Sequence, residues 1–154
     1  MLGEISISNI SKAKYPNLPF SLLKDDILGK KYSLSIAMVT EKISKEINTR
    51  YRNKNKSTNV LSFPLSKTEG EIILCPKVIE RESKNPEKNF GKDYRKLFGF
   101  LVIHGMLHLK GMQHGAIMEI QEKKYDQKYF YRDRRGNHHD TSRSGRISKG
   151  RKKS

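Results

Sequence analysis

The chain has 154 residues, of which 32 are Lys or Arg and 16 are Asp or Glu, so its formal net charge is +16 at pH 7. This length suits one domain with a short extension. A single Cys excludes a disulfide framework and favours a reducing, cytoplasmic compartment. The longest mostly apolar stretch, residues 97–109, is too short to cross a bilayer, and the first residues do not resemble a signal peptide. The composition therefore favours a polyanionic partner, above all nucleic acid, over a membrane.

The first half of the chain alternates short strands with short helices. Apolar and polar residues alternate in residues 4–9 and again in residues 32–39, which predicts two strands. Between them, apolar residues recur at helical spacing over residues 20–27, and Gly29 is typical of a helix end. Thr40 is a suitable N-cap for a further short helix.

The second half continues this order after a polar, basic segment at residues 48–58. Residues 59–63 and 70–75 are predicted strands, and a proline closes each of them. Helical segments are expected at residues 78–84, at the strongly apolar residues 92–110, and at residues 117–130. Interleaved strands and helices predict an α+β (mixed α/β) fold, in which several helices pack on a mixed sheet of about four strands.

Composition divides the chain into a folded body, residues 1–130, and a basic tail, residues 131–154. The tail contains nine Lys or Arg against two Asp, a net charge of +7, and only two residues of the apolar set. So few apolar side chains cannot offset the entropy lost on ordering, which predicts a disordered segment. It is either a solvated extension or an RNA-binding arm.

Three of the five histidines lie within eleven positions, at His104, His108 and His114. His104 and His108 are four residues apart, so on a helix they project from the same face. Leu97 and Leu101 precede them at the same spacing, which indicates that this face points into the protein. A single His on such a face is more often a hydrogen-bonded core residue, but three together favour a metal site.

Gly111 lies between the second and third histidines. A glycine accepts a positive φ angle, so the helix can stop there and the chain can fold back until His114 reaches the first two. Three neutral imidazoles on a buried helix and the turn after it predict one zinc ion per chain with an open fourth position. In such sites the pKa of bound water falls to about 7.

The same spacing occurs in metzincin proteases, which use a Glu after the first His as general base. Gly105 occupies this position here. Loss of the base would cost a protease a factor of about 10²–10⁴ in rate. The sequence therefore disfavours a metzincin-like protease.

Residues 104–114 resemble the signature of the YbeY family of bacterial rRNA maturation factors, which are metal-dependent endoribonucleases. They match His-Gly-x-Leu-His-Leu-x-Gly-Tyr-Asp-His at nine of eleven positions, counting the two free ones. Residues 51–64 and 70–75 resemble the family segments Tyr-Arg…Pro-Thr-Asn-Val-Leu-Ser-Phe-Pro and Gly-Asp-(Leu/Ile)-x-Ile-Cys. The departures are Met112 and Gln113 where the family usually has Tyr-Asp, and Ser57 where it has Pro.

This resemblance implies a mixed four-stranded sheet, one zinc held by the three histidines, and cleavage of single-stranded RNA. It also implies work on the 3′ end of 16S rRNA and in ribosome quality control, with an rRNA precursor and the ribosome or its small subunit as partners. By the same resemblance, Arg52 would be the catalytic cation that faces the metal. Without the resemblance, the sequence favours a solvated cation in a loop at this position. Arg50, Lys54 and Lys56 would extend a basic track for RNA, and Tyr51 offers a stacking face.

Two alternatives to an endoribonuclease stay open. The chain could be a non-catalytic RNA-binding factor in ribosome assembly, with a structural zinc. It could also be another metal-dependent hydrolase, acting on a small phosphoester or a peptide, which would need a general base near the zinc. No membrane association is expected, and no protein partner can be identified from the sequence.

Overall fold

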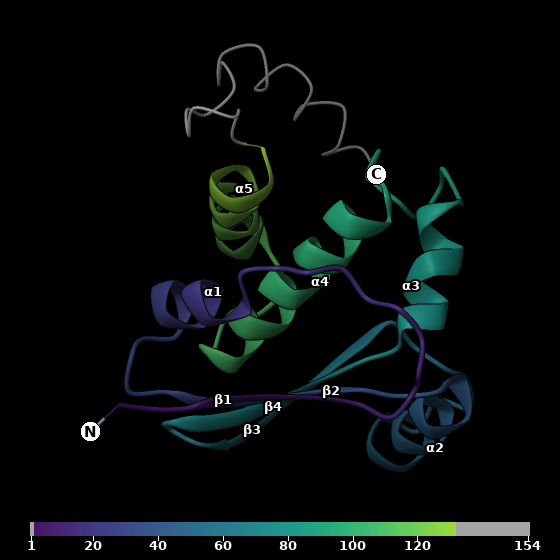
Figure 1. Ribbon diagram of the computed structural model, residues 1–154, viewed down its shortest axis with the longest axis horizontal. Helices are drawn as coiled ribbons and strands as arrows, with labels where there is room; N and C mark the ends of the chain where they lie inside the picture. Colours follow the sequence, from purple (N-terminus) through teal and green to yellow (C-terminus); the bar gives the residue numbers. More distant parts are fainter. Residues whose placement is uncertain (1, 132–154) are drawn as a thin grey trace.

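The computed structural model describes residues 2–131, so the predicted basic tail lies outside the described residues except for Tyr131. Strands and helices are interleaved, as the sequence predicts (Figure 1). They are β1 (Ile5–Asn9), α1 (Phe20–Ile27), β2 (Ser33–Met38), α2 (Glu41–Arg52), β3 (Val60–Ser66), β4 (Glu69–Leu74), α3 (Pro76–Ser83), α4 (Tyr94–Leu109) and α5 (Ala116–Phe130).

The four strands form one mixed sheet in the order β1-β2-β4-β3. β1, β2 and β4 run parallel, and β3 pairs antiparallel with β4, so β1 and β3 lie at the two edges. With five helices packed on it within residues 2–131, this sheet confirms the predicted α+β fold. None of these helices is long and apolar enough to cross a membrane.

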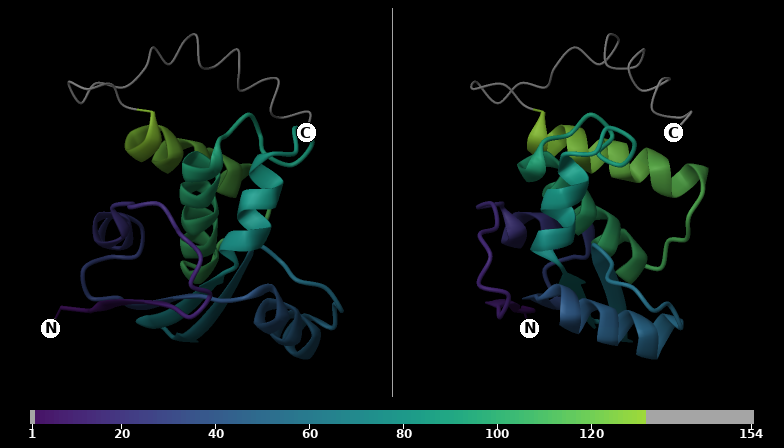
Figure 2. Two further views of the ribbon diagram at one scale, coloured as in Figure 1. Left: turned by 45° about the vertical axis from the view of Figure 1, so that its right-hand side comes forward. Right: turned by 90° about the vertical axis from the view of Figure 1, so that its right-hand side faces the viewer.

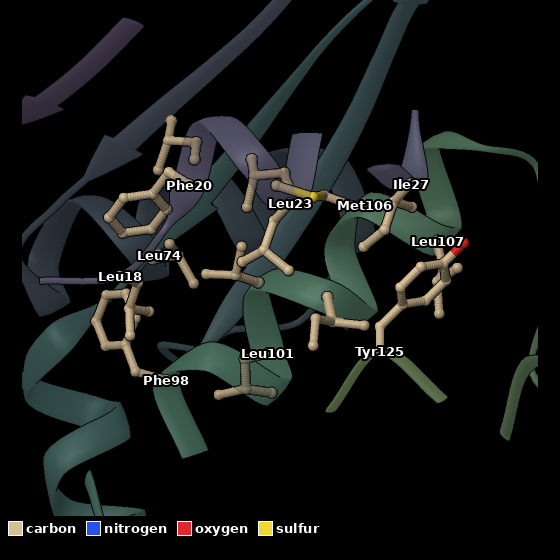
Figure 3. Packing of buried hydrophobic residues seen from close by; sticks show 14 of the residues in the cluster. Leu18, Phe20, Leu23, Ile27, Leu74, Phe98, Leu101, Met106, Leu107 and Tyr125 are labelled. Atoms are coloured by element: carbon tan, nitrogen blue, oxygen red, sulfur yellow. The ribbon is translucent and has the colours of Figure 1, made fainter. Parts of the chain in front are cut away.

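The helices divide unequally between the two faces of the sheet. α1, α3, α4 and α5 lie over one face, and α2 lies alone over the other (Figures 1 and 2). The larger core lies under α4, where Ile36 and Ile72 of the sheet are fully buried. Phe98 and Leu107 of the helix are fully buried in the same core (Figure 3). α4 is therefore held against the sheet on one side and against its neighbouring helices on the others.

Three element boundaries differ from the prediction. α2 is longer than expected and runs to Arg52, where Asn53 adopts a left-handed conformation and ends it. The apolar periodicity stops before the helix does, because the last turns of α2 face solvent. β3 continues through Pro64 to Ser66. An edge strand tolerates a proline, because no neighbouring strand needs the N–H groups on its outer side. α3 begins at Pro76, which suits the first turn of a helix.

Candidate functional site

The first two histidines lie on α4, the most buried helix of the described chain. Asp93 caps its start, where the side chain accepts a hydrogen bond from the backbone N–H of Lys96. Leu97 is 1% exposed and Leu101 is 6% exposed, which confirms that their face of the helix points inward. His104 and His108 continue this face and are half-buried. A rigid, well-packed helix thus fixes the positions of both imidazoles.

The turn after α4 brings the third histidine to the same place. Gly111 has a φ of +103°, and the N–H of Met112 donates to the carbonyl of Leu107, so the chain reverses as predicted. The ring of His114 lies 5.2 Å from that of His104 and 4.7 Å from that of His108, centre to centre. An open pocket at this turn is lined by His108, Gly111, Met112, Gln113 and His114.

Hydrogen bonds fix which ring nitrogens are free. Nδ1 of His104 lies 2.6 Å from a carboxylate oxygen of Glu122, and Nδ1 of His108 lies 3.0 Å from the carbonyl oxygen of Met112. Both neighbours are acceptors, so each Nδ1 carries the proton and donates it. The two Nε2 atoms keep their lone pairs and face each other across 3.0 Å. Two lone pairs in this arrangement repel each other unless a cation joins them.

The three histidines could therefore hold one metal ion. One ligand atom from each lies within 4.8 Å of the others. Nitrogens bound tetrahedrally to zinc at about 2.0–2.1 Å stand about 3.3 Å apart, so only small side-chain shifts are needed. Burial lowers the pKa of His108, and the neighbouring His104 lowers it further, which favours the neutral form that binds metal. Neutral imidazole suits zinc among several transition metals.

Glu122 of α5 belongs to the site, and the sequence reasoning missed it. Its residue is only 9% exposed, and its carboxylate accepts the Nδ1 proton of His104. Carboxylates in this position orient a metal-binding imidazole and raise its basicity. Helical spacing could have identified it, because Met118, Glu122 and Tyr125 lie on the same buried face of α5. Gln113, where the family usually has Asp, is exposed.

Gly105, the residue after the first histidine, packs closely against the sheet. A Cβ atom at this position would lie 3.0 Å from the hydroxyl oxygen of Ser62 and 3.2 Å from Cδ1 of Ile72. Ser62 also donates a hydrogen bond to the carbonyl of Gly105. The position faces the sheet at close contact, so a larger side chain there requires its neighbours to shift.

The predicted basic residues lie on the last turn of α2 and in the loop after it. α2 packs through Ile43 and Ile47 on the face of the sheet opposite α4, and Arg52 is its last residue. Arg50, Tyr51 and Arg52 are exposed on the last turn of α2, and Lys54 and Lys56 are exposed in the loop that follows. Within residues 2–131, Arg52 forms no hydrogen bond or ion pair through its side chain. The structure thus brings the three histidines close together, while the catalytic role of Arg52 stays a prediction.

Comparison with known proteins gives a consistent result. The family model described as "Endoribonuclease YbeY" matches residues 2–132. Proteins named Endoribonuclease YbeY from Buchnera aphidicola and Lactobacillus helveticus are 37% and 35% identical over 115 and 121 residues, covering 63% and 66% of this chain and 70% and 67% of theirs. The solution structure of a Thermotoga maritima protein matches with a TM-score of 0.54 and 27% identity, over 80% of this chain and 87% of that one. The three sequence blocks, the fold and these matches agree, and the chain belongs to the YbeY family of endoribonucleases.

Proposed function

We propose that this protein is a zinc-dependent endoribonuclease specific for single-stranded RNA. It acts in rRNA maturation at the 3′ end of 16S rRNA and in ribosome quality control, in the cytoplasm. Its partners are rRNA precursors and the ribosome or its small subunit. The observation that carries the proposal is the convergence of three imidazoles, two of which have their Nδ1 atoms engaged and their Nε2 atoms free.

Each part of the site has a role in phosphodiester cleavage. His104, His108 and His114 would hold the zinc ion, which when bound would supply positive charge to the phosphate and lower the pKa of a water to about 7. Glu122 keeps the His104 ring in the orientation and tautomer that leave Nε2 free. Arg52 adds a fork of N–H donors for the phosphate as its negative charge rises.

RNA binding is spread over the basic surface. The cations of Arg50, Lys54 and Lys56 form a track for the phosphates beside the exposed ring of Tyr51. Residues 1–130 form the endoribonuclease domain. The basic tail, residues 131–154, adds electrostatic affinity for RNA.

Two observations favour catalysis over the alternatives. A structural zinc usually has four protein ligands, whereas three side chains converge here beside an open pocket. This favours an open coordination position over a purely structural metal. Hydrolysis of a peptide would call for a base near the metal, and the metzincin position holds Gly105, which has no carboxylate.

The direct test combines metal analysis with an RNA cleavage assay. The purified protein should contain about one zinc per chain and cut single-stranded RNA. His108→Ala should lose both properties, whereas the control His138→Ala, which changes a histidine of the tail, should keep them. If zinc-loaded protein leaves RNA intact, while a variant lacking all three histidines still complements a deletion strain, the catalytic proposal fails.

A further inference from the structure

The edge strand β3 separates two surfaces of different chemistry. Ser62 faces α4, because its hydroxyl donates to the carbonyl of Gly105, the residue next to His104. Phe63 faces the opposite side of the sheet and packs on the smaller core under α2. Consecutive residues of one edge strand therefore contact the metal-binding helix and the end of α2.

An aromatic pair lies on the α2 side of this edge. The rings of Tyr51 and Phe63 are 5.3 Å apart and meet edge to face at 66°. Tyr51 is nevertheless 62% exposed, because this contact covers only part of its ring. A ring held on one side and open on the other is a platform on which a nucleobase can stack.

The cations around this platform are available for phosphates. Arg50, Arg52, Lys54 and Lys56 are all exposed, and none forms an ion pair within the described part of the chain. Cations are favoured at the C-terminal end of any helix, which would explain the two arginines by stability alone. That explanation does not extend to the exposed aromatic ring or to the two lysines beyond the helix.

The loop that carries the two lysines is fixed to α2. The buried side chain of Asn48 donates to the carbonyl of Lys56, at 2.9 Å. The hydroxyl of Ser44 donates to the carbonyl of Thr58 and accepts from its N–H. The loop therefore holds its shape before a ligand binds, which lowers the entropy lost on binding.

We propose that single-stranded RNA crosses the β3 edge of the sheet, with a base stacked on Tyr51 against Phe63. The phosphates next to this base contact Arg50 and Lys54, and the strand continues around the edge to the three histidines. The inference rests on the proposed function, and it makes Tyr51 and Phe63 an RNA subsite separate from the metal. Because α2 and α4 lie on opposite faces of the sheet, an RNA strand bound at both places has to cross the β3 edge.

Binding of the zinc-loaded full chain to a labelled, 2′-O-methylated oligoribonucleotide of about 12 nucleotides tests this subsite. Tyr51→Ala should weaken binding by about 5- to 150-fold, the fold-change that corresponds to one stacked base. Tyr51→Trp should keep the affinity, and because the chain has no Trp, its fluorescence reports stacking directly through quenching by RNA. The matched control is Leu65→Ala, an exposed apolar residue of the same strand, which should change nothing.

Cleavage kinetics separate this inference from the proposed function. Tyr51→Ala should raise KM for the long RNA, whereas Leu65→Ala should leave both KM and kcat unchanged. Unaltered affinity in Tyr51→Ala, or unquenched fluorescence of Tyr51→Trp at saturating RNA, would overturn the subsite even if the enzyme cuts RNA normally. Quenching and weakened binding without any cleavage would instead support the subsite and refute the catalytic proposal.

Discussion

The hydrogen bond between Glu122 and His104 offers a sharp test of the metal site. Glu122→Gln keeps the size of the side chain and a carbonyl oxygen that can accept the Nδ1 proton, but it removes the negative charge. The wild-type contact is short, at 2.6 Å, and the carboxylate lies on a side chain that is 11% exposed, so solvent screens it little. Removing an orienting partner of a metal ligand typically costs 10- to 100-fold in metal affinity.

We expect Glu122→Gln to lose about tenfold in zinc affinity, because the hydrogen bond survives without its charge. Glu122→Ala should lose about 100-fold, because the His104 ring then loses its orientation as well. These factors correspond to about 1.4 and 2.7 kcal/mol of binding free energy. Competition with a chromophoric chelator measures the affinity directly, and the thermal midpoint of the metal-free variants excludes unfolding as the cause.

Glu119→Gln is the matched control, since Glu119 lies one turn earlier on α5 and is exposed. It removes the same charge from the same helix without touching a histidine. If Glu122→Gln binds zinc as tightly as the wild type, the carboxylate does not support the metal site. If Glu119→Gln weakens binding equally, the effect is a general electrostatic one and the argument from the 2.6 Å contact is wrong.

Three further outcomes follow from the described packing and charge. Gly105→Glu should destabilise the protein by about 3 kcal/mol or more in urea denaturation, because a carboxylate is forced against the sheet; a stable variant would contradict the contacts at this glycine. Burial alone would raise the pKa of Asp26, but hydrogen bonds from Lys128 and Tyr129 outweigh it and hold the pKa below its usual 3.8. This contribution to stability is complete above the usual pKa and disappears as the pH falls through the lowered one, so Asp26→Asn should be less stable than the wild type at neutral pH, with a gap that closes in strong acid. Deletion of residues 131–154, which carry a net charge of +7, should weaken RNA binding and flatten its salt dependence at unchanged zinc content; an identical salt titration would exclude an RNA-binding tail.

The fold followed from the sequence wherever the periodicity was strong. The alternation in β2 and the apolar stripe of α4 identified both elements, since each buries one regular face. The predicted end of α2 was wrong because Asn48 is polar yet 1% exposed, and it stabilises the next loop instead of packing in an apolar core. The predicted end of β3 before Pro64 was also wrong, because the sequence alone does not reveal that β3 is an edge strand.

The site was predicted where its residues are close in sequence. His104, His108 and His114 come from one helix and its following turn, so helical spacing and one glycine were enough to bring them together. Glu122 comes from a different helix, and its contact depends on how α5 packs on α4. A tertiary contact of this kind has no local signal beyond a carboxylate on an otherwise buried face.

The metal centre therefore depends on two segments of the chain, α4 with its following turn and the later helix α5. The three imidazoles come from α4 and the turn after it, and both segments precede α5 along the chain. Glu122 lies on α5, so the hydrogen bond that orients His104 depends on the docking of this helix. A chain in which α5 is not docked therefore has three imidazoles without the carboxylate that fixes the tautomer of His104.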